Sequence, residues 1–228
     1  MKFGGLVSNS LIDFPGRPAM IAFTQGCNWL CPFCHNPRLI SKRSLSTIEG
    51  ESIIKLVAKR PEGARNLVIT GGEPTIQPEL LDFLDSCRNT EIRVKLDTNG
   101  SQSEILQTVI EENLVDYVAM DVKGPIDRYE ELVGCECDCD AIRRSIQLLK
   151  RVAIDYEFRT TVVPALHREA DFRKLGELLK GGKRLVLQAF RPHRVLEPEL
   201  RDSAPPTDLD LAHYGKILNA YLRTEIRK

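Results

Sequence analysis

Three cysteines within eight consecutive residues are the strongest chemical signal in this chain. Cys27, Cys31 and Cys34 have the spacing C-x3-C-x2-C, with the aromatic Phe33 just before the last of them. Thiolates bind zinc and iron–sulfur clusters, and both usually take four ligands. Because no obvious fourth ligand is near, we favour a cubane cluster whose fourth iron stays open for a substrate or cofactor. Three buried or zinc-binding cysteines are the alternative.

Three other polar segments each follow a predicted strand. Gly71-Gly72-Glu73-Pro74 combines a carboxylate with two glycines, which let a ligand approach the backbone closely. Asp97-Thr98-Asn99-Gly100 and Met120-Asp121-Val122-Lys123 add oxygen ligands and an ammonium group. Taken singly, these segments are also explained by a glycine turn, a turn with a helix cap and a solvated lysine. These segments indicate a function only because they occur together with the segment that holds Cys27, Cys31 and Cys34, which we call the cysteine segment.

Together these segments resemble the radical S-adenosylmethionine (radical SAM) superfamily, and within it the glycyl-radical-enzyme activases. Gln25-Gly26-Cys27 and Cys34-His35-Asn36-Pro37 belong to the same likeness. The resemblance implies that the three cysteines hold a [4Fe–4S] cluster whose open iron binds S-adenosylmethionine. An external reductant of the flavodoxin or ferredoxin type would supply one electron, and the cofactor would split into methionine and a 5′-deoxyadenosyl radical. That radical would take a hydrogen atom from a glycine of a partner enzyme.

The resemblance also implies roles for single residues. Asp97, Thr98, Asp121 and the carbonyl group of Met120 match a monovalent-cation site beside the cofactor, and Asp13 matches an acid near the substrate glycine. An outward-facing arginine at position 159 or a surface histidine at position 193 would instead be ordinary. The residues implied to contact the cofactor are Phe33, Gly71, Gly72, Glu73, Asp97, Asn99, Lys123, Arg159 and His193.

The segment around Asp13 indicates a particular branch of the family. With the bulky Phe14 before Pro15-Gly16, it resembles the long form of the activating proteins of anaerobic ribonucleoside-triphosphate reductase. A β-turn leading into a strand would explain Pro15-Gly16 equally well. Three rival functions stay open: radical chemistry on a small molecule, as in 7-carboxy-7-deazaguanine synthase, radical chemistry on another peptide, and a zinc-stabilised binding module.

A second group of cysteines departs from the family pattern. Cys135, Cys137 and Cys139 alternate along the chain, so an extended segment would place all three on one side. They could bind a metal or a second cluster, form a redox-active pair, or be loop residues before a helix. Because a second cluster usually needs four ligands, and Cys87 is the one other cysteine left, we favour loop residues.

Alternating elements place these segments at one edge of a sheet. The patterns predict strands at 19–24, 67–70, 92–96, 116–120, 156–163 and 184–190, and helices at 47–60, 77–88, 103–113, 140–151, 169–180 and 208–226. Such alternation predicts an α/β fold with parallel strands and outer helices, namely a partial (β/α)6 barrel, with an open doubly wound sheet as the alternative. The carboxyl ends of parallel strands carry the sites in these folds. We expect a core at 1–196, and residues 197–228 in the same domain.

Composition excludes several classes of function. The 228 residues carry 32 basic and 32 acidic side chains, which argues against a dedicated nucleic-acid or anionic-membrane binder. Residues 1–12 lack a signal peptide pattern, and no apolar run is long enough to span a bilayer. Seven cysteines, odd in number and clustered, suit a reducing compartment, so we expect a cytoplasmic protein.

Overall fold

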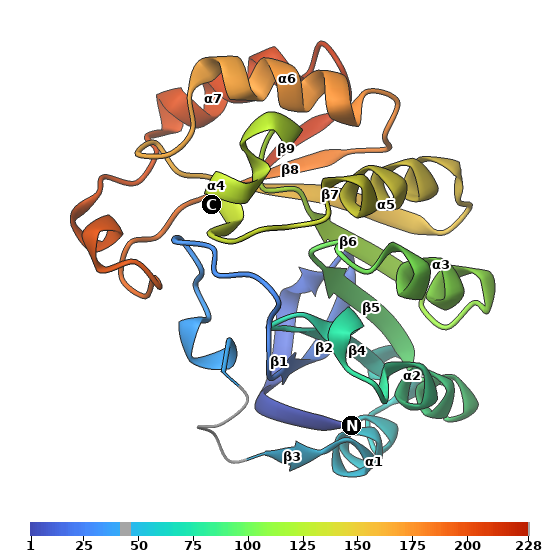
Figure 1. Cartoon of the computed structure of the whole chain (residues 1–228). Coiled ribbons are helices and arrows are strands. Elements are labelled where there is room, and N and C mark those ends of the chain that lie inside the picture. The colour runs from blue at the N-terminus through green and yellow to red at the C-terminus, as the bar shows by residue number, and fades with distance from the viewer. Residues whose placement is uncertain (42–46, 228) are drawn as a thin grey trace. The chain divides into compact units, whose positions relative to one another are not determined.

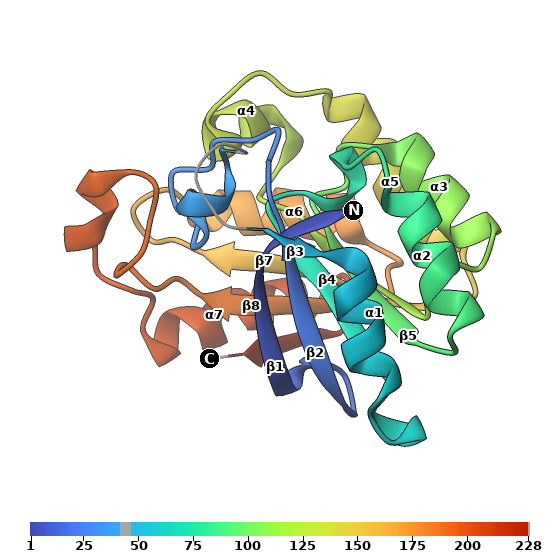
Figure 2. The ribbon, with the colours of Figure 1, turned by 90° about the horizontal axis from the view of Figure 1, so that it is seen from below.

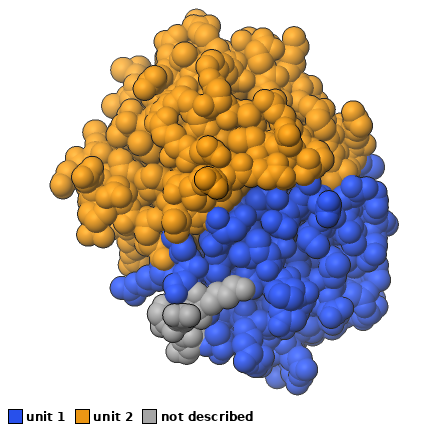
Figure 3. All heavy atoms as spheres, viewed as in Figure 1, with its two compact units in different colours: residues 1–28, 38–119, 153–155 blue, residues 29–37, 120–152, 156–228 orange. Residues whose placement is uncertain are grey.

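The computed structural model describes residues 1–41 and 47–227, which divide into two units (Figure 3). Unit 1 contains residues 1–28, 38–119 and 153–155, and unit 2 contains residues 29–37, 120–152 and 156–228. Each unit is described by itself.

Unit 1 is built on a β-hairpin that continues into parallel strands. β1 (Lys2–Phe14) and β2 (Arg17–Thr24) pair antiparallel through a turn at Pro15-Gly16, and they are the two dark blue strands of Figure 2. β2 pairs parallel with β4 (Asn66–Gly71), which pairs parallel with β5 (Arg93–Thr98). The short β3 (Ile48–Glu49) pairs with the start of β1. The order is therefore β3-β1-β2-β4-β5.

Amphipathic helices alternate with these strands along the chain (Figure 1). They are α1 (Gly50–Ala58), α2 (Leu80–Asn89) and α3 (Ser103–Glu111), each burying apolar residues at helical spacing. Leu67, Val68 and Ile69 of β4 are fully buried, as expected for a strand covered on both faces. Three-residue 3-10 turns occur at Pro37–Leu39, Glu62–Ala64 and Pro74–Ile76.

Unit 2 contains three parallel strands in the order β7-β8-β9. They are β7 (Asp155–Val162), β8 (Leu185–Ala189) and β9 (Thr224–Arg227). Its helices are α4 (Tyr129–Val133), α5 (Cys139–Arg151), α6 (Glu169–Leu179) and α7 (Asp208–Leu218), with 3-10 turns at Ile126–Arg128 and Pro198–Asp202. β6 (Tyr117–Asp121) crosses from unit 1 into unit 2 at Met120.

The predicted strands and helices are present, and three predictions need correction. The sheet of unit 1 is not purely parallel, because β1 is an antiparallel strand whose mixed polar and apolar residues hid it. The helix predicted at 208–226 ends at Leu218, and residues 224–227 form β9 instead. The helix predicted at 47–60 begins at Gly50, because Ile48 and Glu49 are extended.

The C-terminal segment packs within unit 2. Tyr214 of α7 stacks on Phe172 of α6 with ring centroids 4.0 Å apart, and β9 pairs with β8. The boundary expected at residue 196 therefore falls inside unit 2, and the assignment of 1–196 as core with 197–228 in the same domain stays a prediction. In the part of the chain that the structure describes, no helix is both long and apolar enough to cross a membrane.

Phe14 anchors the hairpin of unit 1. Its ring is buried in an apolar cluster with Ile21 and Val68, and it lies 6.2 Å from the ring of Tyr117. The bulk at position 14 therefore has a packing explanation.

We predict that Phe14→Ala lowers the free energy of unfolding by about 3–5 kcal/mol, because it leaves a cavity in this cluster. Leu11→Ala on the same strand is the control: Leu11 is 71% exposed, so its truncation should change stability by less than about 0.5 kcal/mol. Urea unfolding followed by circular dichroism measures both. Equal losses for the two variants would contradict the packing role.

Candidate cofactor site

In unit 1, the cysteine segment starts where two backbones approach closely. The amide of Gly72 donates to the carbonyl of Thr24 (3.0 Å), and the amide of Glu73 donates to the carbonyl of Gly26 (2.8 Å). A Cβ on Gly72 would lie 2.1 Å from the oxygen of Gly26, and Gly71 has a φ of +117°. Both glycines are therefore needed for the backbone contact that holds the residues before Cys27.

The carboxylate of Glu73 joins the ends of β4 and β5. It is 1% exposed and accepts four hydrogen bonds: from the amide and hydroxyl of Thr75 (3.0 and 2.6 Å), the hydroxyl of Thr98 (2.7 Å) and the amide of Asn99 (2.7 Å). Burial raises the pKa of Glu73, and these donors oppose the rise. The side chain expected to offer an acceptor to the cofactor thus serves as a clamp within the protein.

Asn99 extends this clamp to the residue after Cys27. Its side-chain amide donates to the side-chain carbonyl of Asn28 (3.0 Å), and the Asn28 amide donates to the hydroxyl of Ser101 (2.8 Å). Gln77 also donates to the backbone carbonyls of Gln25 and Glu73 (2.9 and 3.1 Å). The residues on both sides of Gly26 and Cys27 are therefore tied to the ends of β4 and β5.

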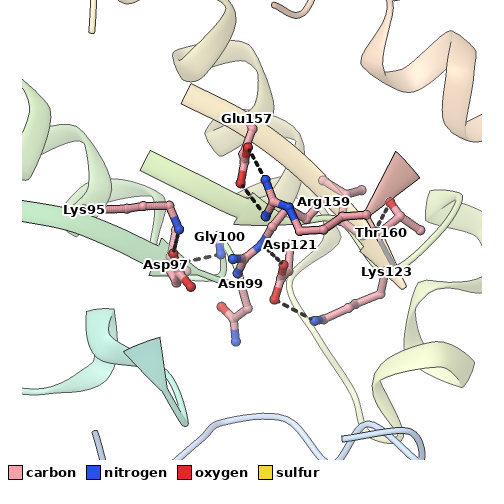
Figure 4. Close-up of polar contacts among 12 residues, drawn as sticks. Lys95, Asp97, Asn99, Gly100, Asp121, Lys123, Glu157, Arg159 and Thr160 are labelled. Atoms are coloured by element: carbon pink, nitrogen blue, oxygen red, sulfur yellow. Dashed lines mark hydrogen bonds and ion pairs between the residues drawn. The ribbon is translucent and has the colours of Figure 1, made fainter. Parts of the chain in front are cut away.

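Asp97, at the end of β5, is paired with a lysine that the sequence patterns did not single out. The Nζ atom of Lys95 lies 2.5 Å from Oδ1 of Asp97 (Figure 4). The signal was present in the sequence, because residues i and i+2 of a strand share a face.

In unit 2, the loop that carries Cys31 and Cys34 is anchored on α4. The amide of Leu30 donates to the carbonyl of Val133 (2.9 Å), and Trp29 packs edge-on against Tyr129. The amide of Cys34 donates to the carbonyl of Cys31 (2.9 Å), which makes a tight turn between the two ligands. Phe33 is buried in this turn, with its ring 6.3 Å from that of His167.

Asp121, at the end of β6, lies between two cations of unit 2. Nε of Arg159 donates to Oδ1 (2.8 Å), and Nζ of Lys123 donates to Oδ2 (3.1 Å), as Figure 4 shows. Burial would raise the pKa of Asp121, but the two cations outweigh it and hold that pKa well below its usual value. Burial disfavours the charged form of Lys123, yet the Asp121 carboxylate raises the pKa of this ammonium overall. Arg159 therefore faces a carboxylate, as expected for an inward-facing arginine.

The backbone of Lys123 is fixed by two residues that sequence reasoning missed. Nδ1 of His167 accepts from the amide of Val163 (3.0 Å), so its Nε2 carries the proton and donates to the carbonyl of Lys123 (2.9 Å). The hydroxyl of Tyr129 accepts from the amide of Lys123 (3.3 Å). Neither residue has a sequence signal, because each acts through tertiary contacts.

The donor chemistry of Cys31 and Cys34 fits a metal cluster. Burial raises the pKa of Cys31 to about 11 and also raises the pKa of Cys34, so both thiols hold their protons at neutral pH unless a metal displaces them. The Lys123 ammonium favours the thiolate form of both. The third cysteine of the predicted ligand set, Cys27, precedes Asn28 in unit 1.

The remaining predicted residues lie in less defined surroundings. Asp13 accepts a hydrogen bond from the hydroxyl of Ser10 at the hairpin. It lies at the opposite end of β2 from Cys27, and a strand of 8 residues is about 26 Å long. His193 is exposed in a turn after β8, and Met120 is buried in β6. Their predicted roles stay predictions.

The second cysteine group does not form a three-ligand site. The Sγ atoms of Cys137 and Cys139 are 3.7 Å apart, whereas the Cys135 thiol donates to the carbonyl of Val133 (3.8 Å). Cys139 begins α5, so the alternation expected for an extended segment ends there. Among residues 1–41 and 47–227, no three His, Cys, Asp or Glu side chains are grouped to hold a metal ion, and this finding covers Cys27, Cys31 and Cys34 as well as the second group.

Comparison with known proteins places these features in a family. A model described as the radical SAM superfamily matches residues 21–179. A Methanocaldococcus jannaschii protein, provisionally named a glycyl-radical enzyme activating enzyme, is 32% identical over 225 residues, 96% of this chain and 92% of its own. A pyruvate formate-lyase-activating enzyme of Clostridium pasteurianum is 26% identical over 205 residues, 86% of this chain and 83% of its own. A 7-carboxy-7-deazaguanine synthase of Neisseria meningitidis is 37% identical over 110 residues, 48% of this chain and 45% of its own.

Solved structures share the fold. Streptococcus suis SuiB bound to S-adenosylmethionine matches 91% of this chain with a TM-score of 0.67 and 15% identity, and this chain spans 49% of SuiB. A domain of a pyruvate-formate lyase-activating enzyme from Bacteroides vulgatus matches 71% of this chain, and 98% of that domain, with a TM-score of 0.57 and 18% identity. These matches confirm the predicted α/β class, with mostly parallel strands and outer helices.

We predict that Gly72→Ala disrupts the cysteine segment, because its Cβ would overlap the Gly26 carbonyl. Iron bound after anaerobic reconstitution should fall by about half or more, and stability by about 2 kcal/mol or more. Gly63→Ala is the matched control, because a Cβ at Gly63 meets nothing within 4 Å. Normal iron content in the Gly72 variant would show that the backbone contact is dispensable.

A further prediction concerns the second cysteine group. Iron and sulfide analysis should find one four-iron cluster per chain, and replacing Cys135, Cys137 and Cys139 together by serine should leave that content unchanged. The close pair Cys137 and Cys139 supplies two of the four ligands that a cluster usually needs, and the Cys135 thiol donates to the Val133 carbonyl. Iron near two clusters per chain, or its loss in the triple variant, would assign these cysteines to a cluster.

Proposed function

This chain belongs to the radical SAM superfamily and has its α/β fold, and from that premise we propose that it is an activase for a glycyl-radical enzyme. The observation that carries the proposal is the 32% identity, over 96% of the chain, to a protein named as such an activating enzyme. The similarity to a pyruvate formate-lyase-activating enzyme, over 86% of the chain, supports the same class. The deazaguanine synthase of Neisseria matches only half of the chain, which favours the protein substrate.

The cofactors that the family implies fit the residues present. We expect Cys27, Cys31 and Cys34 to hold a [4Fe–4S] cluster. When bound, this cluster and S-adenosylmethionine supply one-electron chemistry that removes a hydrogen atom from an unreactive C–H bond. The chain itself holds both groups in place, balances their charge and keeps water away.

The turn after β4 is our proposed site for the amino group of S-adenosylmethionine. The Glu73 carboxylate is 1% exposed and accepts four hydrogen bonds from the chain, so we propose the backbone carbonyls of Gly71 and Gly72 as acceptors for the ammonium. The role of Glu73 and Asn99 is then to fix this turn and the cysteine segment.

In unit 2, Lys123 and Arg159 are proposed to bind the cofactor carboxylate. An ammonium has three donors and a guanidinium has five, so each side chain can serve Asp121 and a second carboxylate. The contacts of His167 and Tyr129 with the Lys123 backbone support a fixed position for this ammonium. Phe33 and His193 are proposed to contact the adenosyl group.

The substrate is proposed to be a glycine in a flexible loop of anaerobic ribonucleoside-triphosphate reductase. The resemblance at Asp13 and Phe14 supports this partner, and a one-electron donor of the flavodoxin or ferredoxin type would supply the electron. Because Asp13 lies at the far end of β2 from Cys27, a loop that contacts both would extend along this strand.

An electron paramagnetic resonance experiment tests the proposal. The reconstituted protein, dithionite and S-adenosylmethionine are mixed anaerobically with purified anaerobic ribonucleotide reductase. We expect a glycyl doublet that disappears when the partner's radical glycine is replaced by alanine or when S-adenosylmethionine is omitted. Deoxyadenosine release without a doublet for any glycyl-radical enzyme, together with turnover of the deazaguanine precursor, would assign the small-molecule function instead.

A further inference from the structure

Lys95 is a fully buried lysine, and its position in unit 1 is unusual. The residue is 0% exposed, although lysine is almost never fully buried unless it is paired. Its neighbours along β5 are the apolar Val94 and Leu96, so the strand alone gives no reason for a charge here. The ammonium must therefore be balanced by tertiary contacts.

The Asp97 carboxylate and the Tyr117 ring both lie near the Lys95 ammonium. Oδ1 of Asp97 lies 2.5 Å from Nζ, with the Asp97 side chain only 10% exposed. The ring centroid of Tyr117 lies 5.9 Å from Nζ, within the range of a cation–π contact. Tyr117 is itself packed in the apolar cluster of Phe14. The Lys95 ammonium therefore lies near the Asp97 carboxylate and near an aromatic ring that is held in place by packing.

The side chains expected to bind a free monovalent cation, those of Asp97, Thr98 and Asp121, are each engaged inside their own unit. In unit 1, Asp97 is paired with Lys95. The hydroxyl of Thr98 donates to Glu73 (2.7 Å) and accepts from the amide of Gly100 (3.0 Å). In unit 2, Asp121 is paired with Arg159 and Lys123. This set does not fit an additional Na⁺ or K⁺.

We propose that the Lys95 ammonium is the resident cation of the Asp97 carboxylate, so that this chain works without an added monovalent metal ion. The ammonium does what a bound ion would do: it neutralises a buried carboxylate at the end of β5. Because it is covalently tethered, its occupancy does not depend on the salt around the protein. Removing it would leave a buried carboxylate beside a space of ammonium size, which K⁺ or NH₄⁺ can enter.

Thermal unfolding of the cluster-free chain tests this proposal independently of the proposed function. The wild-type midpoint should be the same in potassium chloride, ammonium chloride and choline chloride at equal ionic strength. Lys95→Met should lower the midpoint in choline chloride by about 10 °C, and K⁺ or NH₄⁺ should restore about half of the loss. Lys55→Met is the control, because the Lys55 side chain is 74% exposed on α1.

A double variant guards against a purely structural explanation. Lys95→Met combined with Asp97→Asn removes the charge as well as the cation, so its midpoint should be insensitive to K⁺. Destabilisation of the single variant without rescue by K⁺ or NH₄⁺ would overturn the proposal. So would equal rescue of the double variant, because the carboxylate would then not be the site of the ion.

A second experiment, which rests on the proposed function, measures the binding of S-adenosylmethionine to the reconstituted protein. Calorimetry should give a wild-type affinity that changes less than about twofold between choline and potassium, whereas Lys95→Met should gain about tenfold from potassium. A wild-type affinity or midpoint that rises steeply with potassium would overturn the proposal. Failure of S-adenosylmethionine to bind at all would contradict the proposed function and leave the thermal arm intact.

Discussion

A buried carboxylate must find hydrogen-bond donors, and in unit 1 this requirement shapes the end of the sheet. Glu73 satisfies it with donors from its own turn and from the end of β5. Leaving such a group unsatisfied would cost several kcal/mol, on the order of the whole stability of a domain. The Glu73 carboxylate thus adds a polar link between the ends of β4 and β5, which also pair through their backbones. The start of the cysteine segment is positioned by the end of β4, because Gly26 contacts the backbone of Gly72 and Glu73 in the turn that follows this strand.

Charge pairing at strand ends recurs in both units. Asp97 is paired with Lys95 two residues earlier on β5, and Asp121 is paired with Lys123 two residues later. Arg159, from β7, adds a second cation to Asp121. Each of these carboxylates therefore has a cationic partner within its own unit.

The sequence patterns predicted the fold class and most of the strands and helices, but not the contacts that the polar residues at the strand ends make. The apolar runs at 67–69 and 185–187 mark buried strands, because a strand covered on both faces has no polar alternation. The patterns did not predict β1, because exposed apolar residues such as Leu11 and Ile12 weaken its alternation of apolar and polar side chains. The patterns did not predict β9, because its four residues continue the helical pattern before them. These residues form a strand through their pairing with β8.

For the site, residue types at strand ends led us to predict roles for Glu73, Asp97 and Asp121, and these roles stay predictions. The residue types were not enough to say what each carboxylate binds. Glu73 was expected to meet a ligand and instead meets the chain. His167 and Tyr129 could not be predicted, because they lie about forty and six residues from the Lys123 backbone that they fix. Lys95 was predictable in principle, since a lysine two residues before an aspartate in a strand shares its face.

The central claim is that Cys27, Cys31 and Cys34 form a ligand set one short of a complete cluster, so that S-adenosylmethionine can be bound and cleaved there. The most direct measurement is 5′-deoxyadenosine released per chain after anaerobic reconstitution and reduction with dithionite. We predict release by the wild-type protein and by Cys135→Ser, and none when any of the three cysteines is replaced by alanine. Release at the wild-type rate by one of those alanine variants would contradict the account.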